Sequence, residues 1–219
     1  LPSVRVGDFN RLKVKELARR EGYGPVFGVY LEGGREGDIL MPQKYVPEDV
    51  KPGDEVDCFV YLDQEERLVA TTEKPLAKVG DFAWLKCAWV NEYGAFLDWG
   101  VTKNLFCPFR EQKRRMEKGR SYIVHVHIDG DSYRIVASAK VERYLVRTTS
   151  DSEGNPGEHV PYKVGDEVSM LVWQKTDLGF KVIIDNAYAG LLYLYLIQIS
   201  EPPRQAEISY AVFCLQKKT

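Results

Sequence analysis

The chain repeats one short turn signal, a glycine followed by an aspartate, in front of runs that look like β-strands. The four copies lie at residues 6–9, 52–55, 79–82 and 164–167. Glycine adopts positive φ at no steric cost and aspartate hydrogen-bonds to nearby backbone, so the pair is typical of a tight turn. The run behind each copy is apolar and rich in β-branched and aromatic residues, at strand length. Recurrence of this pattern predicts a chain built from repeated all-β units.

Each repeat continues with a second glycine-containing hairpin, around Gly28, Gly94 and Gly179, and then a short apolar strand. In the first two repeats a closing hairpin follows and ends at residues 67–71 and 134–138. About five short strands in roughly 70 residues favour a small closed barrel. We therefore expect an all-β chain of tandem five-stranded OB-fold barrels, the third incomplete or truncated after about residue 193.

Changes in composition suggest the boundaries of these units. We expect a first barrel at 1–75, a second at 76–145, a polar linker at 146–161 rich in Gly, Pro, Ser and Thr, and a divergent third unit at 162–219. Beyond Tyr193, residues 208–213 are either a closing strand or a divergent tail, and the sequence leaves both open. The best helix signal, at 110–118, is too short and too charged for more than a turn or two.

The formal net charge of −2 hides an uneven distribution. Residues 1–75 have 11 basic and 15 acidic side chains, residues 76–145 have 12 and 8, and residues 146–219 have 7 and 9. The total argues against a charge-driven nucleic-acid binder, but the middle unit is basic. Between residues 103 and 120 only Glu111 and Glu117 oppose a set of basic side chains, which are Lys103, Arg110, Lys113, Arg114, Arg115, Lys118 and Arg120. This run predicts either a phosphate-binding loop or a loop kept solvated by its charge.

Two motifs of the middle unit resemble a known module. The hairpin Tyr93-Gly94-Ala95-Phe96 and the ending 134–138, Arg-Ile-Val-Ala-Ser, resemble the ribosomal S1-type RNA-binding domain, an OB-fold barrel. Three tandem units with Lys-Val-Gly-Asp openings resemble the CvfB (conserved virulence factor B, YitL-like) family of bacterial proteins, over residues 4 to about 193. Members of that family usually end in a winged-helix domain, for which we find no pattern here.

The resemblance implies RNA binding through the barrel face, with two hairpin aromatics stacking on bases. A stacking histidine is usual on the third strand, but Pro42, Pro108 and Tyr193 occupy the matching positions. Leu178 and Lys181 replace the aromatics of the third unit, which we therefore expect to be structural. The expected RNA-binding residues are Tyr93, Phe96, Phe106, Arg134, Lys103, Arg110, Lys113, Arg114 and Arg115 in the middle unit, and Phe27, Tyr30 and Arg67 in the first.

Geometry supplies an alternative for the aromatics, which is that they fill the barrel core. Tyr93 and Phe96 are three residues apart, so in a regular strand they face opposite sides. A glycine-associated bulge would be needed to turn both outward. If it is present, aromatics on an exposed sheet bind single strands with little sequence preference, because every base has a π-face.

The sequence gives little support for a catalytic or metal-binding function. The chain has no phosphate-binding loop, nucleophile elbow or zinc-protease motif. His125 and His127 share a strand face without a third ligand, and the cysteines, Cys58, Cys87, Cys107 and Cys214, form no C-x-x-C pair and read as reduced thiols. We see no leader and no apolar run of about 18 residues. We expect a cytoplasmic, non-enzymatic RNA-binding protein without cofactor, regulatory by family resemblance. Two alternatives remain. The chain is a scaffold of barrels that binds protein instead of RNA, or it is an accessory module of a nuclease.

Overall fold

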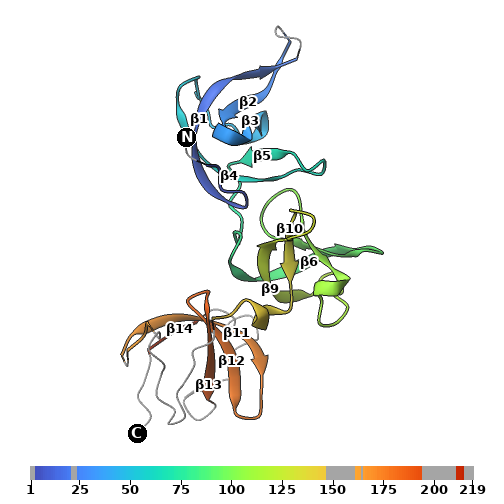
Figure 1. The fold of residues 1–219 in the computed structure, drawn as a ribbon, viewed down its shortest axis with the longest axis vertical. Coiled ribbons are helices and arrows are strands. Elements are labelled where there is room, and N and C mark those ends of the chain that lie inside the picture. Colours follow the sequence, from blue (N-terminus) through green and yellow to red (C-terminus); the bar gives the residue numbers. More distant parts are fainter. Residues whose placement is uncertain (1–2, 21–23, 147–160, 164, 194–210, 215–219) are drawn as a thin grey trace. The chain divides into compact units, whose positions relative to one another are not determined.

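The computed structural model describes residues 3–20, 24–146, 161–163, 165–193 and 211–214, the last as backbone. The fold is built from β-strands, as predicted (Figure 1). The chain divides into two compact units, Leu1–Ala139 and Lys140–Thr219, which we describe separately. None of the described helical elements is long and apolar enough to cross a membrane.

The first unit begins with a closed barrel, which we call barrel one. Its strands close in the order β1-β2-β3-β5-β4, with β3 and β5 parallel and the other neighbours antiparallel. The strands are β1 (Asp8–Arg19), β2 (Val26–Glu32), β3 (Asp38–Pro42), β4 (Glu55–Leu62) and β5 (Leu68–Thr71). Its interior is filled by inward-facing aliphatic side chains that alternate with exposed ones, among them Val14, Leu31, Ile39 and Met41.

Barrel two follows in the same unit and has the same topology. Its closed order β10-β8-β7-β6-β9 again pairs the third and fifth strands in parallel, through Phe106 and Val136. The strands are β6 (Phe82–Val90), β7 (Gly94–Asp98), β8 (Leu105–Pro108), β9 (Ser121–Ile128) and β10 (Ile135–Ser138). Two closed five-stranded barrels confirm the predicted tandem OB folds.

Three of the four glycine–aspartate copies form the same turn. At the first copy Gly7 also has a positive φ, of 73°, but the Asp8 side chain accepts a hydrogen bond from the N–H of Phe9 instead. Gly53, Gly80 and Gly165 have φ of 99°, 97° and 101°, a conformation that favours glycine. In each turn the aspartate side chain accepts a hydrogen bond from the backbone N–H three residues earlier. These bonds join Lys51 to Asp54 (2.9 Å), Lys78 to Asp81 (3.0 Å) and Lys163 to Asp166 (2.7 Å). The repeat in the sequence is therefore a repeat in local structure.

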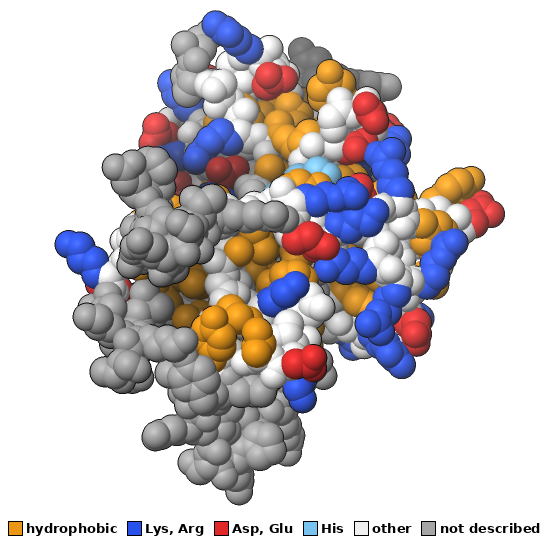
Figure 2. Space-filling view, turned by 60° about the horizontal axis from the view of Figure 1, so that its bottom comes forward, with side chains coloured by type: hydrophobic (Ala, Val, Ile, Leu, Met, Phe, Trp, Pro, Cys, Tyr) orange, Lys and Arg blue, Asp and Glu red, His pale blue; other side chains and the backbone are white. Residues whose placement is uncertain are grey.

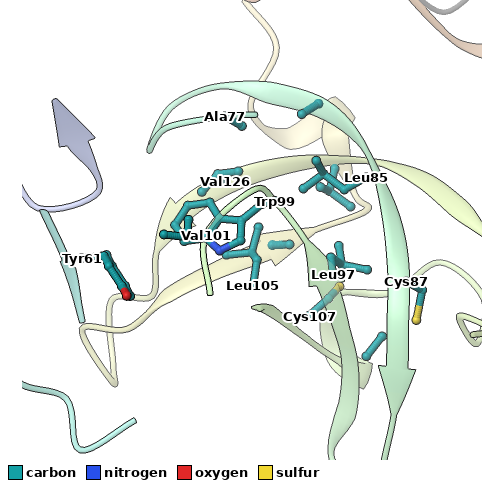
Figure 3. Packing of buried hydrophobic residues seen from close by; sticks show 14 of the residues in the cluster. Tyr61, Ala77, Leu85, Cys87, Leu97, Trp99, Val101, Leu105, Cys107 and Val126 are labelled. Atoms are coloured by element: carbon teal, nitrogen blue, oxygen red, sulfur yellow. The ribbon is translucent and has the colours of Figure 1, made fainter. Parts of the chain in front are cut away.

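Barrels one and two share a hydrophobic core. Phe59, Tyr61 and Val69 of barrel one are buried in one cluster with residues of barrel two. Trp99 lies in this cluster with its ring 5.6 Å from Phe59, edge to face, and donates its indole N–H to the carbonyl of Lys103 at 2.7 Å. Figure 3 shows Trp99 directed among the strands of barrel two, near Val126 and Leu105. The two barrels thus form one packed body.

The second unit contains a four-stranded open sheet in the order β13-β12-β11-β14. Its strands are β11 (Glu167–Lys175), β12 (Gly179–Ile184), β13 (Tyr188–Tyr193) and β14 (Ala211–Cys214). β14 pairs with β11 as β4 pairs with β1, so residues 211–214 take the closing-strand position. Apart from residues 146 and 161, the predicted linker lies outside the described residues.

Helical structure in the described part of the chain consists of short 3-10 turns. They are η1 (Gly34–Glu36), η2 (Gln43–Tyr45), η3 (Phe109–Glu111) and η4 (Val141–Arg143). The helix signal at 110–118 yields only η3. Gln112 explains this, because its side chain donates to the carbonyl of Cys107 at 3.0 Å and accepts from the N–H of Met116 at 2.9 Å. These two bonds stabilise a loop conformation in place of a helix.

Candidate nucleic-acid interface

A groove of about 1030 Å³ lies on barrel two and is bordered by one turn of barrel one. One wall is aromatic, and the rest combines arginine, lysine and carboxylate side chains. The aromatic and charged side chains that line it are Trp89, Tyr93, Phe96, Phe106, Lys103, Arg110, Arg134, Glu66, Asp129 and Asp131. It brings together six of the nine residues predicted for the middle unit.

Three aromatic rings on adjacent strands form what we call the aromatic platform: Trp89 on β6, Phe96 on β7 and Phe106 on β8. Trp89 and Phe96 stack in parallel, with ring centroids 3.8 Å apart and planes 3° apart. Phe106 lies beside them, its centroid 5.0 Å from that of Phe96. The rings are cross-strand partners, because Trp89 pairs with Phe96 and Phe96 with Phe106. Cross-strand aromatic contacts of this kind stabilise the sheet and hold the rings in place.

A register shift in β6, between Cys87 and Trp89, turns Trp89 outward. Regular alternation would place Trp89 on the same face as Leu85 and Cys87, which are both buried. The irregularity needed to expose the aromatics therefore lies in β6 and not at Gly94. Sequence reasoning missed Trp89 for this reason, since nothing in the run 84–90 marks the position of the bulge.

The β6–β7 hairpin places Tyr93 at the edge of the groove. Tyr93 precedes β7 and belongs to the turn, so strand alternation does not separate it from Phe96. The Asn91 side chain accepts hydrogen bonds from the N–H groups of Tyr93 and Gly94, at 2.9 and 3.2 Å. A Cβ on Gly94 would lie 2.4 Å from the carbonyl oxygen of Cys107, so the turn requires glycine. The Tyr93 residue is 67% exposed, whereas Phe96 is half-buried.

The basic side chains predicted for RNA divide into two groups. Arg110 lines the groove and pairs with Asp129 at 2.7 Å; the Ser132 hydrogen bonds, together with the arginine, lower the pKa of that carboxyl. Lys113, Arg114 and Arg115 lie outside the groove lining, on the exposed loop that follows η3. Arg115 covers the Phe109 ring at 3.4 Å. Figure 2 shows Lys and Arg side chains gathered close to exposed hydrophobic ones on the face in view.

Lys103 and Arg134 both contact barrel one. The ammonium group of Lys103 donates to the carbonyls of Leu62 and Asp63, at 2.9 and 2.7 Å, and its burial lowers the pKa of the lysine. The Arg134 guanidinium forms an ion pair with Glu66. The sequence predicted that both side chains bind RNA. It could not show that they contact barrel one, because these contacts join residues far apart in the chain.

The predicted residues of barrel one do not line this groove. Phe27 and Tyr30 are half-buried on β2, and Arg67 is held by Asp63 and Glu65 of its own turn, at 2.9 and 3.0 Å. Strand pairing places Glu16 and Leu40 on either side of Tyr30, where barrel two has Trp89 and Phe106 beside Phe96. Barrel one therefore has one ring where barrel two has three.

In the sheet of the unit Lys140–Thr219, Lys181 occupies the position that Phe96 has in barrel two. Gly179 pairs with Tyr193 as Gly94 pairs with Pro108, which makes Lys181 the counterpart of Phe96. Its ammonium group lies 5.4 Å from the centroid of the Trp173 ring. The aromatic platform is thus not repeated in this sheet.

The His125 side chain and the described cysteine side chains, which could bind a metal or react, are buried, and these cysteines are free thiols. His125 is buried, its Nε2 lies 3.2 Å from the carbonyl of Gly80, and burial together with the charge of His127 lowers the pKa of His125 to about 4. Cys58, Cys87 and Cys107 are free thiols in the two barrel interiors, and the side chain of Cys214 lies outside the described part. Among the described residues, no group of three or more His, Cys, Asp or Glu side chains is arranged to hold a metal ion.

Comparison with known proteins confirms the resemblance seen in the sequence. Residues 6–73, which include barrel one, match the S1 domain family. The chain is 37% identical over 79 residues to the uncharacterized protein YitL of Bacillus subtilis (strain 168). That match covers 36% of this chain and 26% of YitL, so it spans about a quarter of that relative.

A solved structure has a similar fold. It is a multidomain protein with nucleic acid binding domains from Streptococcus pneumoniae TIGR4. The two superpose with a TM-score of 0.50 over 97% of this chain and 74% of the other, at 15% identity. At that identity the likeness is one of fold. Residues 6–73 therefore match the S1 domain family, part of the chain is homologous to YitL, and the fold is similar to that of a multidomain protein with nucleic acid binding domains.

Proposed function

We propose that this chain is a non-enzymatic protein that binds single-stranded RNA in the groove of barrel two. The observation that carries the proposal is the aromatic platform, three rings on adjacent strands bordered by Arg110 and Arg134. The match to the S1 domain family and the similarity of fold to a structure with nucleic acid binding domains support the general class of ligand.

The platform can stack bases on its outer surfaces only. Trp89 and Phe96 are already in ring contact at 3.8 Å, which leaves no room for a base between them. Trp89 is nevertheless 43% exposed and Tyr93 67%, so each offers a surface to a splayed base. A stacked base contributes about 1–3 kcal/mol, with little preference among bases. Two or three such contacts would supply about 2–9 kcal/mol, against the roughly 8 kcal/mol that corresponds to a micromolar Kd.

Cationic groups beside the rings would receive the phosphates. Arg110 and Arg134 lie in the groove, and Arg114 is exposed on the adjacent loop. Arginine binds phosphate through two parallel N–H donors, which fixes the course of the RNA backbone while the bases turn toward the rings. Lys103 we now assign to the junction with barrel one, because two backbone carbonyls already occupy its ammonium group.

Binding of a labelled single-stranded RNA, measured by fluorescence anisotropy at several salt concentrations, tests the proposal. We expect micromolar or tighter binding at low salt and a log–log salt slope of about −0.7 for each phosphate contacted. Replacing both Tyr93 and Phe96 with alanine should weaken binding at least tenfold, whereas the matched pair Phe27→Ala and Tyr30→Ala in barrel one should change it little. Reversing the charge of Arg114 and Arg115 should flatten the slope.

Absence of binding by the native protein at low salt would contradict the proposal. The alternative then is a protein-interaction scaffold, for which the acidic surplus of residues 1–75 provides the charge. A regulatory role in bacterial gene expression, exerted in the cytoplasm, is a further part of the proposal and is supported by the family resemblance alone.

A further inference from the structure

One of the two arginines in the groove of barrel two, Arg134, has its ion-pair partner in the other barrel. In barrel one, Arg67 is neutralised locally by Asp63 and Glu65 of the turn that precedes it. Arg134 occupies the equivalent place before β10, but the carboxylate that it pairs with is Glu66 of barrel one. Glu66 itself lines the groove. Barrel one therefore supplies a charged wall of a site whose aromatic platform belongs to barrel two.

The turn that presents Glu66 is held from both barrels. Within barrel one, the Asp63 carboxylate accepts hydrogen bonds from the N–H groups of Glu65 and Arg67, at 2.8 and 2.9 Å. Glu66 has a φ of 63°, the left-handed conformation that follows from this tight turn. From barrel two, Lys103 donates to the carbonyl of Asp63 at 2.7 Å. Glu66 is thus positioned by the turn and by the lysine clamp, and not only by its attraction to Arg134.

The ion pair is exposed enough to be exchanged for a ligand. The side chains of Arg134 and Glu66 are 55% and 42% exposed. Exposed ion pairs contribute little to stability, because water already solvates both charges. A phosphodiester carries one negative charge and presents two oxygens to the guanidinium, as the carboxylate does. An RNA phosphate and the Glu66 carboxylate therefore offer the Arg134 guanidinium a similar pair of anionic oxygens.

We propose that Glu66 is a specificity-determining residue of the groove, which lowers its affinity for single-stranded RNA by occupying Arg134. This rests on the proposed function of barrel two and adds to it that barrel one is part of the same binding site. Binding then requires that a phosphate displace the carboxylate, so a strand gains this arginine only when base stacking on the platform already holds it in the groove.

The test compares two neighbouring charge-neutral variants, Glu66→Gln and Glu65→Gln. Both remove one negative charge from the same turn and keep the side-chain shape, but Glu65 pairs with Arg67 and not with the groove arginine. In the anisotropy assay we expect Glu66→Gln to bind single-stranded RNA about 3- to 10-fold more tightly than the native protein, and Glu65→Gln to stay within about twofold. The salt slope of Glu66→Gln should stay close to that of the native protein, because both contact the same phosphates once the carboxylate is displaced.

A second background separates this inference from the general function. In an Arg134→Gln protein the Glu66→Gln change should have no effect, because its target is gone. Equal gains for Glu65→Gln and Glu66→Gln, or a gain that survives in Arg134→Gln, would overturn the role of Glu66 while leaving RNA binding intact. Absence of binding by the native protein and by every variant, Glu66→Gln included, would overturn both proposals.

Discussion

Barrels one and two have the same strand order and nearly the same register, yet their outer faces differ in chemistry. Strand pairing aligns three positions on the first three strands: Glu16 with Trp89, Tyr30 with Phe96 and Leu40 with Phe106. The barrel interiors, by contrast, are mainly aliphatic in both, apart from the aromatic rings of Phe59, Tyr61 and Trp99 in the core that the barrels share. Inward-facing residues are constrained by packing, whereas outward positions on the same strands vary without cost to the fold. The comparison teaches that a repeated barrel need not repeat a site.

The largest expected effect comes from Trp99, whose counterpart in barrel one is Gly33 by the same alignment. Trp99 is 2% exposed and packs in the core shared by the two barrels. Trp99→Ala should lower the free energy of unfolding by about 3–5 kcal/mol and separate the unfolding of the two barrels. Urea denaturation followed by far-UV circular dichroism and by hydrogen exchange measures both. A single transition with an unchanged midpoint would show that the shared core contributes little.

The next effect concerns a histidine that barrel one lacks. His125 pairs with Phe82 as Phe59 pairs with Phe9, so the counterpart of His125 is Phe59. Because burial lowers the pKa of His125 to about 4, the unfolded chain takes up a proton that the folded chain does not. The stability that depends on the neutral ring is complete above about pH 6.5 and is lost as the pH falls toward 4.

His125→Phe, which copies barrel one, should therefore remove a destabilisation on the order of 2–3 kcal/mol between these pH values. Urea midpoints of the native protein and the variant, measured from pH 7.5 down to about 4.5, provide the comparison. The difference between the two proteins at neutral pH serves as the reference for packing changes. Parallel pH profiles would mean that other groups dominate acid sensitivity.

The smallest effect in energy is the most informative about binding. Trp89→Ala removes the exposed ring of the platform, and Tyr30→Ala removes the single ring at the equivalent face of barrel one. We expect Trp89→Ala to weaken single-stranded RNA binding by about 1–2 kcal/mol, or roughly 5- to 30-fold, and Tyr30→Ala to weaken it less than about twofold. Equal losses of RNA affinity from the two changes would show that barrel one also contacts the RNA, and would contradict the functional difference between the two barrels.

Sequence reasoning was strongest where local chemistry determines structure. The glycine–aspartate turns, the glycine hairpins and the run of strands follow from backbone preferences of single residues, and these predicted the barrels. A glycine is needed at position 94 because the Cβ of any other residue there would collide with the neighbouring strand, a constraint that the hairpin motif already contains.

It was weakest where a residue's role depends on register or on a distant part of the chain. Trp89 faces the groove because β6 shifts register, and a one-residue slip reverses the face of a side chain. Lys103 was predicted to bind phosphate from its charge alone, but its ammonium group is used by carbonyls some 40 residues earlier in the chain. Glu66 was not a candidate at all, since only the packing of two barrels brings it to Arg134.

The core shared by the barrels also bears on how such a chain evolves. Tandem repeats are often treated as modules that duplication and recombination move one at a time. Here a crossover between residues 75 and 76 would leave Phe59 and Tyr61 on one product and Trp99 on the other, each an uncovered aromatic surface. The pair of barrels is therefore the smallest segment that recombination can transfer with its hydrophobic core intact, although the sequence contains two repeats there.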